Sequence, residues 1–167
     1  MLKRFFPAEM ADSVFTIDYD KFWDAGIRGL IFDIDNTLAT FDVPHPDKKT
    51  TQLLSDLTKK GFAIAFLSNN KKERVELFNK DFGYPHIWKA KKPRLDGINR
   101  ILEMLKLSRK QVVLIGDQIF TDCWVGRRAG VHTILTKPIA LRDEWQVKLK
   151  RYPEKIVLRA YARRQND

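Results

Sequence analysis

Short runs of β-branched and aromatic residues alternate along this chain with amphipathic segments of helical length. Three of the runs, residues 30–32, 62–67 and 112–115, are too short to favour a helix, and each stops before a polar segment. Apolar runs of this length indicate buried strands. Strands that alternate with helices are typical of βαβ units in a parallel sheet. The pattern therefore predicts an α/β fold with a mostly parallel central sheet.

The segments between these runs carry signals for the starts and ends of helices. One helix is predicted to begin after Pro46, with Asp47 as its N-cap, and to end before Gly61, a residue suited to a C-terminal cap. A second helix is predicted over residues 95–105, with Pro93 near its start. Further strands are expected at two runs, 84–88 and 131–135.

The two ends of the chain have less regular patterns. Residues 1–28 are predicted to wrap the core as short helical turns. The basic tail, residues 143–167, is predicted to be helical, with an N-cap at Asp143 and an interruption near Pro153. Because no repeat, low-complexity stretch or flexible linker divides residues 1–167, we expect a single domain.

The charge of the chain says more about its partners than about its fold. Lysine and arginine number 31 against 21 acidic residues, which gives a formal net charge of +10. This excess favours anionic partners, such as nucleic acid, anionic lipid headgroups or phosphorylated small molecules. The basic residues are spread along the chain, so a solvated surface without such a partner is an equal alternative. The basic tail is expected to be a solvated face, with docking on anionic lipid as the alternative.

The cysteine content and the apolar runs bear on the compartment. Cys123 is the single cysteine, which excludes an intrachain disulfide and favours a reducing compartment. We expect it to be a small buried hydrophobe rather than a nucleophile, because no histidine partner is identifiable. No apolar run approaches the ~20 residues that span a bilayer, and the stretch after Arg4 is too short for a secretory signal. We expect a cytoplasmic protein, with peripheral contact to the inner face of the membrane as an alternative.

Polar side chains follow the predicted strands at the points where the strands end. In an open α/β sheet these ends meet at one edge, where helix N-termini also point their free N–H groups. Acids, hydroxyl groups and ammonium groups are therefore expected to meet there. The candidates are Asp33, Asp35 and Thr37 after the first strand, Ser68, Asn69 and Asn70 after the second, Asp117 and Asp122 after residues 112–115, and Lys89, Lys91 and Lys92 after residues 84–88.

This set of side chains suits phosphate chemistry. Carboxylates brought together repel one another unless a cation is bound, and oxygen ligands suit Mg²⁺. A hydroxyl, a helix N-terminus and a lysine suit phosphate oxygens. Asp33 and Asp35 lie two apart on a segment predicted to be extended, so both can approach one substrate, one as a nucleophile and the other as an acid and base. The set therefore fits metal-assisted phosphoryl transfer.

Four motifs occur in a specific order along the chain: the run DIDNT at residues 33–37, the strand-ending Ser68, the pair Lys92 and Pro93, and the run GDQIFTD at residues 116–122. In this order they resemble the haloacid dehalogenase superfamily of aspartate-nucleophile phosphatases. The chain is most similar to the YqeG-like branch of the class III (IIIA) phosphatases, which are related to phosphatidylglycerophosphatases. The N-terminal run FFPAEMADSVFTID and the later run GRRAGVHTIL also resemble that branch. The resemblance implies a three-layer Rossmann-like fold and a Mg²⁺-dependent phosphomonoester phosphatase.

The resemblance also implies a role for each matching acid. Asp33 would be the nucleophile and would bind Mg²⁺ through its other carboxylate oxygen. Asp35 would protonate the leaving alcohol, then deprotonate the attacking water, and would bind the metal through its backbone carbonyl. Asp117 would be a further Mg²⁺ ligand, and Asp122 would orient Lys92 or a metal-bound water.

Other matching residues would bind the phosphate or support the site. Ser68 and the backbone N–H of Asn69 would hold phosphoryl oxygens. Lys92 would neutralise the charge that Asp33 shares with the phosphate, and Thr37 would brace the motif loop. Lys92 is chosen from the three clustered lysines because the lysine of the family precedes a proline; its two neighbours would face solvent or bind a second anionic group.

The spacing of the motifs leaves no room for a separate cap domain. Only 34 residues separate Asp33 from Ser68, and 23 separate Ser68 from Lys92, and the helices and strands of the core use both segments. An uncovered site is open to large substrates, such as a lipid headgroup, a nucleic-acid end or a phosphoprotein.

Three functions follow from these observations. The preferred substrate is phosphatidylglycerophosphate, because the branch resemblance and the basic charge agree. A phosphatase acting on nucleic-acid ends is the enzymatic alternative, since it needs the same chemistry and charge. A non-catalytic RNA-associated or ribosome-associated module on the same fold is the alternative from another class, and the intact set of acids with Lys92 argues against it.

Overall fold

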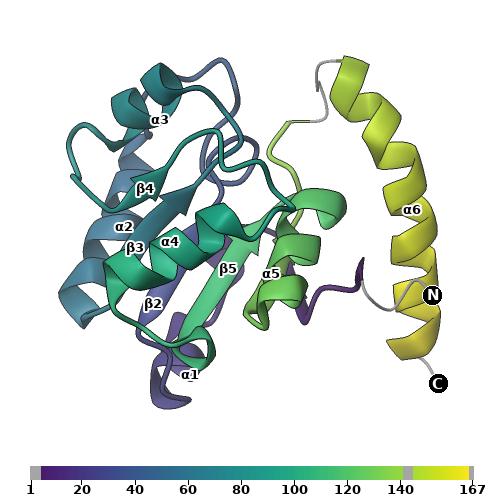
Figure 1. Cartoon of the computed structure of the whole chain (residues 1–167), viewed down its shortest axis with the longest axis horizontal. Coiled ribbons are helices and arrows are strands. Elements are labelled where there is room, and N and C mark those ends of the chain that lie inside the picture. Colours follow the sequence, from purple (N-terminus) through teal and green to yellow (C-terminus); the bar gives the residue numbers. More distant parts are fainter. Residues whose placement is uncertain (1–4, 141–144, 166–167) are drawn as a thin grey trace.

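A parallel six-stranded sheet forms the centre of the computed structural model, which describes residues 5–140 and 145–165 (Figure 1). The strand order is β1-β6-β5-β2-β3-β4, and every neighbouring pair is parallel. The strands are β1 (Glu9–Ala11), β2 (Gly29–Phe32), β3 (Ala63–Leu67), β4 (His86–Ile87), β5 (Val112–Gly116) and β6 (His132–Thr136).

Helices connect the strands. The α-helices are α1 (Tyr19–Asp24), α2 (Lys48–Lys60), α3 (Lys72–Asn79), α4 (Asp96–Leu105), α5 (Trp124–Ala129) and α6 (Trp145–Gln165). The shorter helical segments are η2 (Val14–Thr16), η3 (Arg109–Gln111) and η4 (Ile119–Cys123), the last a π-helix. In the described part of the chain, no helix combines the length and the apolar character that a bilayer span requires.

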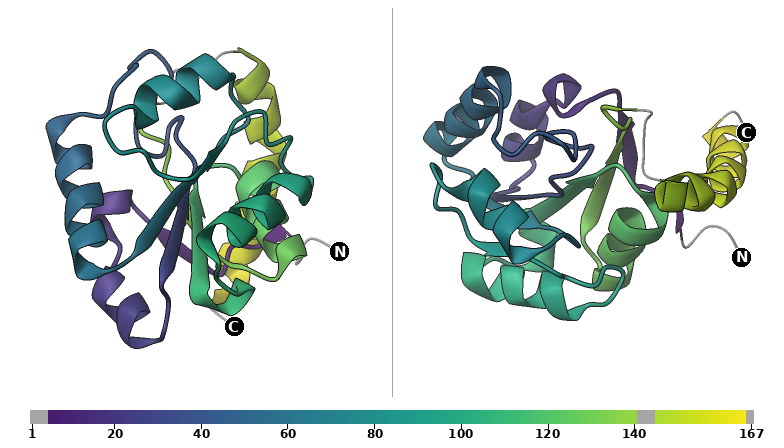
Figure 2. Two further views of the ribbon diagram at one scale, coloured as in Figure 1. Left: turned by 60° about the vertical axis from the view of Figure 1, so that its left-hand side comes forward. Right: turned by 90° about the horizontal axis from the view of Figure 1, so that it is seen from above.

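The sheet is buried on both faces, which gives the fold three layers. In β2, Leu30 and Phe32 pack into the core cluster that also holds α1, α2 and α3, whereas Ile31 packs into the cluster that holds α4 and α5. This division follows from the period-two alternation of side chains along a strand. Figure 2 shows α1 and α2 on one side of the sheet, α4 and α5 on the other, and α6 beyond the end of the sheet. The predicted α/β fold without a separate cap domain is confirmed.

The helix predicted between Pro46 and Gly61 is α2. The Asp47 side chain accepts a hydrogen bond from the backbone N–H of Thr50 at 2.7 Å, as an N-cap does. Gly61 ends the helix with a φ of 111°, a left-handed conformation that glycine adopts readily. Leu54 is fully buried, so the apolar stripe of this helix faces the core. The helix predicted over residues 95–105 is α4.

Other elements differ from the predictions. The chain before residue 28 forms α1 and η2 as short helical turns, but it also contributes the edge strand β1, which pairs with β6. Helix α3 follows β3 where no helix is predicted, and the strand predicted over residues 84–88 shortens to the two residues of β4. β1 has three residues, one of them Glu9, so only its pairing with β6 identifies it.

The interruption predicted near Pro153 is wrong, because α6 runs without a break through this residue. A proline inside a helix removes one backbone hydrogen bond. Glu154 and Val157, which follow it, are both buried, and Val157 packs with residues of η4 in a third core cluster. This packing offsets the lost bond. The N-cap predicted at Asp143 lies outside the described residues.

Candidate active site

The candidate site lies at the edge of the sheet where three adjacent strands end. Asp33 directly follows β2, Ser68 follows β3, and Asp117 follows β5. Because these three strands are parallel neighbours, their carboxyl ends meet at the same edge (Figure 1). This is the position at which open α/β sheets bind ligands.

Lys92 bridges two of the buried acids. Its Nζ donates hydrogen bonds to Asp33 Oδ1 at 2.7 Å and to Asp122 Oδ1 at 2.6 Å, and its side chain is only 2% exposed. The side chain of Asn69 holds the backbone of Lys92 in place: its Oδ1 accepts from the Lys92 N–H at 2.7 Å, and its Nδ2 donates to the Lys92 carbonyl at 3.3 Å. The neighbours Lys89 and Lys91 are exposed, so Lys92 is the lysine of the cluster that enters the site.

Three buried carboxylates lie close together here, and Lys92 contacts two of them. Asp33, Asp117 and Asp122 each offer an oxygen, and these oxygens lie within 4.8 Å of one another. Burial raises the pKa of Asp33 to about 7; Lys92 opposes this shift and the negative charge of Asp122 adds to it. Burial by itself would lower the pKa of Lys92, but the charges of Asp122 and Asp33 outweigh it and hold that pKa above its ordinary value. One buried ammonium therefore contacts two of three clustered acids.

A tight turn after β2 sets the positions of Asp33 and Asp35. The Ile34 carbonyl accepts hydrogen bonds from the N–H groups of Thr37, Leu38 and Ala39, and Asn36 has a left-handed φ of 62°. Thr37 is buried, and its hydroxyl donates to Asp33 Oδ2 at 3.5 Å, a long contact. The turn thus begins where the regular strand stops.

Asp35 stands apart from the three-carboxylate cluster. Its side chain is partly exposed, and it accepts hydrogen bonds from Asn70 Nδ2 at 2.9 Å and Arg74 Nε at 3.1 Å. Asp35 still lies close enough to Asp33 for its charge to raise the pKa of that carboxyl slightly.

Ser68 is buried at the end of β3. Its Oγ accepts a hydrogen bond from the N–H of Asn70 at 3.0 Å, and its own N–H donates to the Ile87 carbonyl of β4 at 3.0 Å. Asn69, which lies between Ser68 and Asn70, is exposed. The structure therefore places Ser68 and Asn69 beside the strand end that carries Asp33.

The loop after β5 depends on a glycine. A Cβ on Gly116 would lie 2.4 Å from the carboxylate of Asp122, so only glycine lets Asp122 reach Lys92. Asp122 Oδ2 accepts the N–H of Gln118 at 3.1 Å, and the π-helix η4 carries this residue inward. Glu154 of α6 accepts the N–H of Ile119 at 2.8 Å, which fixes the same loop from outside.

Two supporting residues were not identified from the sequence. In the sequence, Arg74 is one more cation of the basic stretch KKER at residues 71–74. Only its position beside Asp35 in the structure connects it with the candidate site. Glu154 does have a sequence signal: it is the single acid between residues 145 and 165, and the apolar Val157 and Tyr161 follow it at helical spacing.

Comparisons with known proteins identify the family. Residues 40–136 match the family of haloacid dehalogenase-like hydrolases. The chain belongs to this family, and the prediction of an enzyme from its phosphatase class is confirmed at that level. A similar relative is the Bacillus subtilis (strain 168) protein named "Probable phosphatase YqeG", which is 36% identical over 165 residues, or 98% of this chain and 96% of that protein.

Solved structures show the same fold. CbbY from Rhodobacter sphaeroides, in complex with phosphate, has a TM-score of 0.54 at 13% identity, over 71% of this chain and 90% of that chain. The cobalt-bound deoxy-D-mannose-octulosonate 8-phosphate phosphatase YrbI from Haemophilus influenzae has a TM-score of 0.54 at 14% identity, over 75% of both chains. Both likenesses bear on the fold alone.

Proposed function

We propose that this protein is a Mg²⁺-dependent phosphomonoester phosphatase that forms an aspartyl-phosphate on Asp33. The observation that carries the proposal is the buried Lys92 ammonium, which contacts Asp33 at 2.7 Å and Asp122 at 2.6 Å. A structural ion pair needs one acid, whereas this lysine contacts two, and the carboxylate of a third, Asp117, lies within 4.8 Å of theirs. Membership of the hydrolase family supports the same reading.

The donor set fits a divalent cation. Three buried carboxylates with oxygens within 4.8 Å of one another repel, and one lysine does not balance them. Oxygen ligands of this kind suit Mg²⁺. Asp33 and Asp117 would bind it through their carboxylates and Asp35 through its backbone carbonyl, while Asp122 is committed to Lys92 and Gln118. When bound, the ion supplies positive charge that offsets the carboxylates and the phosphoryl oxygens.

In the first step, a carboxylate oxygen of Asp33 forms a bond to phosphorus while the bond from phosphorus to the ester oxygen breaks. Asp35, in its protonated form, gives its proton to the leaving alkoxide, which departs as an alcohol. The Ser68 hydroxyl, the N–H of Asn69 and the Lys92 ammonium hold the phosphoryl oxygens as negative charge redistributes.

In the second step, water attacks the phosphorus of the aspartyl-phosphate. Asp35, now a carboxylate, takes a proton from this water, and the bond between phosphorus and the Asp33 oxygen breaks. Inorganic phosphate leaves, and both acids return to their starting states.

Exposed apolar side chains near the site support an amphiphilic substrate, for which we propose phosphatidylglycerophosphate. Phe41, at 57% exposed, and Val43 lie on the segment between β2 and α2, and Trp88 follows β4. Ile139, at 52% exposed, donates its N–H to the Asn36 carbonyl of the turn after Asp33. Apolar groups beside an uncovered phosphate site fit a lipid chain next to a headgroup.

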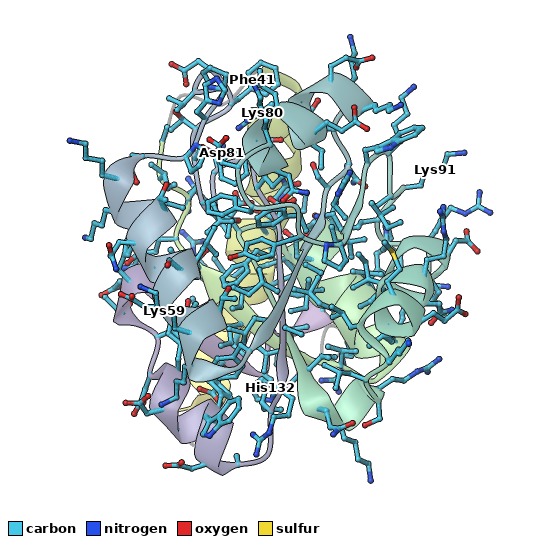
Figure 3. The ribbon with its side chains drawn as sticks, turned by 90° about the vertical axis from the view of Figure 1, so that its left-hand side faces the viewer. Phe41, Lys59, Lys80, Asp81, Lys91 and His132 are labelled. Carbon is cyan, nitrogen blue, oxygen red and sulfur yellow. The ribbon has the colours of Figure 1, made fainter. Side chains whose placement is uncertain are left out.

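Figure 3 places one of these groups relative to the sheet. Phe41 lies at the upper end of the molecule, and His132, the first residue of β6, lies toward the lower end. Because the parallel strands begin at the lower end, Phe41 stands at the edge where they finish.

Phosphate release by the purified protein tests the proposal. With Mg²⁺, it should hydrolyse an aryl phosphate, and both excess EDTA and Asp33→Asn should abolish this activity. Equal rates for the wild type and Asp33→Asn would refute the mechanism.

A substrate panel separates the candidate substrates. Turnover of phosphatidylglycerophosphate in vesicles at a higher rate than soluble phosphoesters supports the lipid. Preferential cleavage of oligonucleotide end phosphates, falling steeply with salt, would instead establish the nucleic-acid alternative. RNA binding without phosphate release under any divalent metal would favour the non-catalytic module.

A further inference from the structure

Arg74 of α3 is almost buried against Asp35. Its side chain is 11% exposed, and both Nε and Nη2 lie 3.1 Å from Asp35 Oδ1. A guanidinium is always charged, and its planar fork matches a carboxylate better than a lysine can. This is a fixed, partly desolvated ion pair, unlike the exposed pairs elsewhere on the surface.

The remaining donors of Arg74 hold the loop that follows Asp35. Nη1 donates to the Pro44 carbonyl at 3.1 Å, and Nη2 approaches the Thr40 carbonyl at 3.4 Å. The guanidinium also lies 5.4 Å from the centre of the Phe78 ring on the same helix. Contacts in several directions leave this guanidinium little freedom to move away from Asp35.

The hydrogen bonds to Asp35 distinguish its two carboxylate oxygens. A carboxylate has about four lone-pair sites. Arg74 Nε takes one of them on Oδ1, with Nη2 also 3.1 Å from that oxygen, and Asn70 takes one on Oδ2. The guanidinium therefore lies against Oδ1, and Oδ2 keeps an acceptor site that can carry the proton that passes to the leaving group.

We propose that Arg74 is a positioning residue that holds Asp35 in the orientation required for proton transfer. This inference rests on the proposed function, because it assumes that Asp35 acts as the acid and base. Arg74 does not contact the reacting atoms: its effect passes through Asp35. Misplacing a catalytic group by about 1 Å can cost roughly a hundredfold in rate.

Arg74→Met tests this role through the dependence of the rate on the leaving group. A 4-nitrophenolate leaving group needs no proton, whereas an alkyl alkoxide does. In rapid mixing with 4-nitrophenyl phosphate and Mg²⁺, Arg74→Met should keep the wild-type rate of nitrophenolate release in the first turnover. Its single-turnover rate with an alkyl phosphate should fall by roughly tenfold to a hundredfold.

Matched variants separate positioning from folding. Lys72→Met removes an exposed cation from the same helix and should leave both rates unchanged. Arg74→Lys keeps the charge with a single ammonium and should recover part of the alkyl phosphate rate. In an Asp35→Asn background, Arg74→Met should cause no further loss on either substrate, because the residue through which it acts has already been disabled.

The outcomes are distinguishable from failure of the proposed function. No phosphate release by the wild type, or no effect of Asp33→Asn, would refute the phosphatase mechanism itself. With an active wild type, equal losses on both substrates for Arg74→Met and Arg74→Lys would show a structural role only. Wild-type rates on both substrates, or a full additional loss in the Asp35→Asn background, would also overturn the inference.

Discussion

Glu154 of the C-terminal helix α6 accepts a hydrogen bond from the backbone N–H of Ile119 at 2.8 Å. Ile119 lies between Asp117 and Asp122, so one buried carboxylate connects the last helix of the chain to the loop that carries two acids of the site. The helix is therefore part of the support of the site.

Glu154→Leu should destabilise the protein and loosen this loop. It leaves the Ile119 N–H buried without its acceptor, which costs about 1–3 kcal/mol. At this chain length the midpoint of thermal unfolding should fall by roughly 2–12 °C. The Kd for Mg²⁺, measured by calorimetry, should rise. Glu154→Gln keeps an acceptor for the Ile119 N–H, and Lys155→Ala changes an exposed neighbour. Both variants should keep an unfolding midpoint and a Kd for Mg²⁺ close to those of the wild type. Equal values for all three variants would contradict the role of this hydrogen bond.

Lys92→Met should remove activity and also destabilise the fold. Breaking a buried ion pair by removing one partner costs about 3–5 kcal/mol, because Asp33 and Asp122 are left buried without their cation. Adding Mg²⁺ should restore part of the lost stability. The exposed Lys91→Met is the matched control and should unfold at the wild-type temperature. Phosphatase activity in Lys92→Met equal to that of Lys91→Met would show that the wrong lysine has been assigned.

Stability without metal should fall as the pH rises through the range set by Asp33. The pKa of this carboxyl is raised from 3.8 to about 7 in the folded protein, chiefly by burial. Between these values the folded state holds more protons than the unfolded state. The stabilisation that comes from protonated Asp33 is therefore complete below about pH 4 and is lost as the pH approaches 7. The slope from this group is at most about 1.4 kcal/mol per pH unit.

Chemical denaturation between pH 4 and pH 8 in EDTA measures this slope. Asp33→Asn should remove it, since the amide does not titrate. Saturating Mg²⁺ should also reduce it, because an ion at the proposed site would bind the ionised carboxylate and compete with the proton. A wild-type slope that is unchanged in Asp33→Asn would assign the pH dependence to other groups.

Cys123 should be unreactive in the folded protein. Its side chain is buried, and burial, reinforced by the charge of Asp122, raises the pKa of its thiol. The thiolate needed for reaction is therefore scarce at neutral pH. A thiol reagent such as 5,5′-dithiobis(2-nitrobenzoate) should react with it only after denaturation, and the Cys123→Ala variant should keep phosphatase activity. Rapid reaction of the native protein would contradict the burial.

Local patterns predict the parts of this fold that depend on nearest neighbours in sequence. The sequence predicts β2, β3 and β5, because strands buried on both faces are runs of consecutive apolar residues. It also predicts both ends of α2, because capping residues stand next to the helix in the sequence. The sequence does not predict β1, because its three residues form a strand only by pairing with β6. Pro153 predicts an interruption of α6 that does not occur, because the packing of α6 outweighs the local tendency of proline to break a helix.

The residues of the candidate site also fall into two groups: those that sequence motifs identify and those that only the structure reveals. Asp33, Ser68 and Lys92 can be found from motif order, and the sheet topology then brings them together. Arg74 cannot be found in this way, because a cation at a helix start normally faces solvent, and its contact with Asp35 exists only once α3 packs over the loop that follows β2. Sequence patterns identify the groups that we propose to react, whereas the groups that we propose to orient them depend on tertiary packing.

A phosphoryl group trapped on Asp33 is the most direct evidence to seek. Rapid acid quenching of the enzyme during turnover of an aryl phosphate with Mg²⁺, followed by peptide mass spectrometry, should find one phosphoryl group on the peptide that contains this residue. Hydroxylamine should remove the group, as expected of an acyl phosphate, and Asp33→Asn should not acquire it. A phosphoryl group on any other residue, or full turnover by Asp33→Asn, would contradict the mechanism.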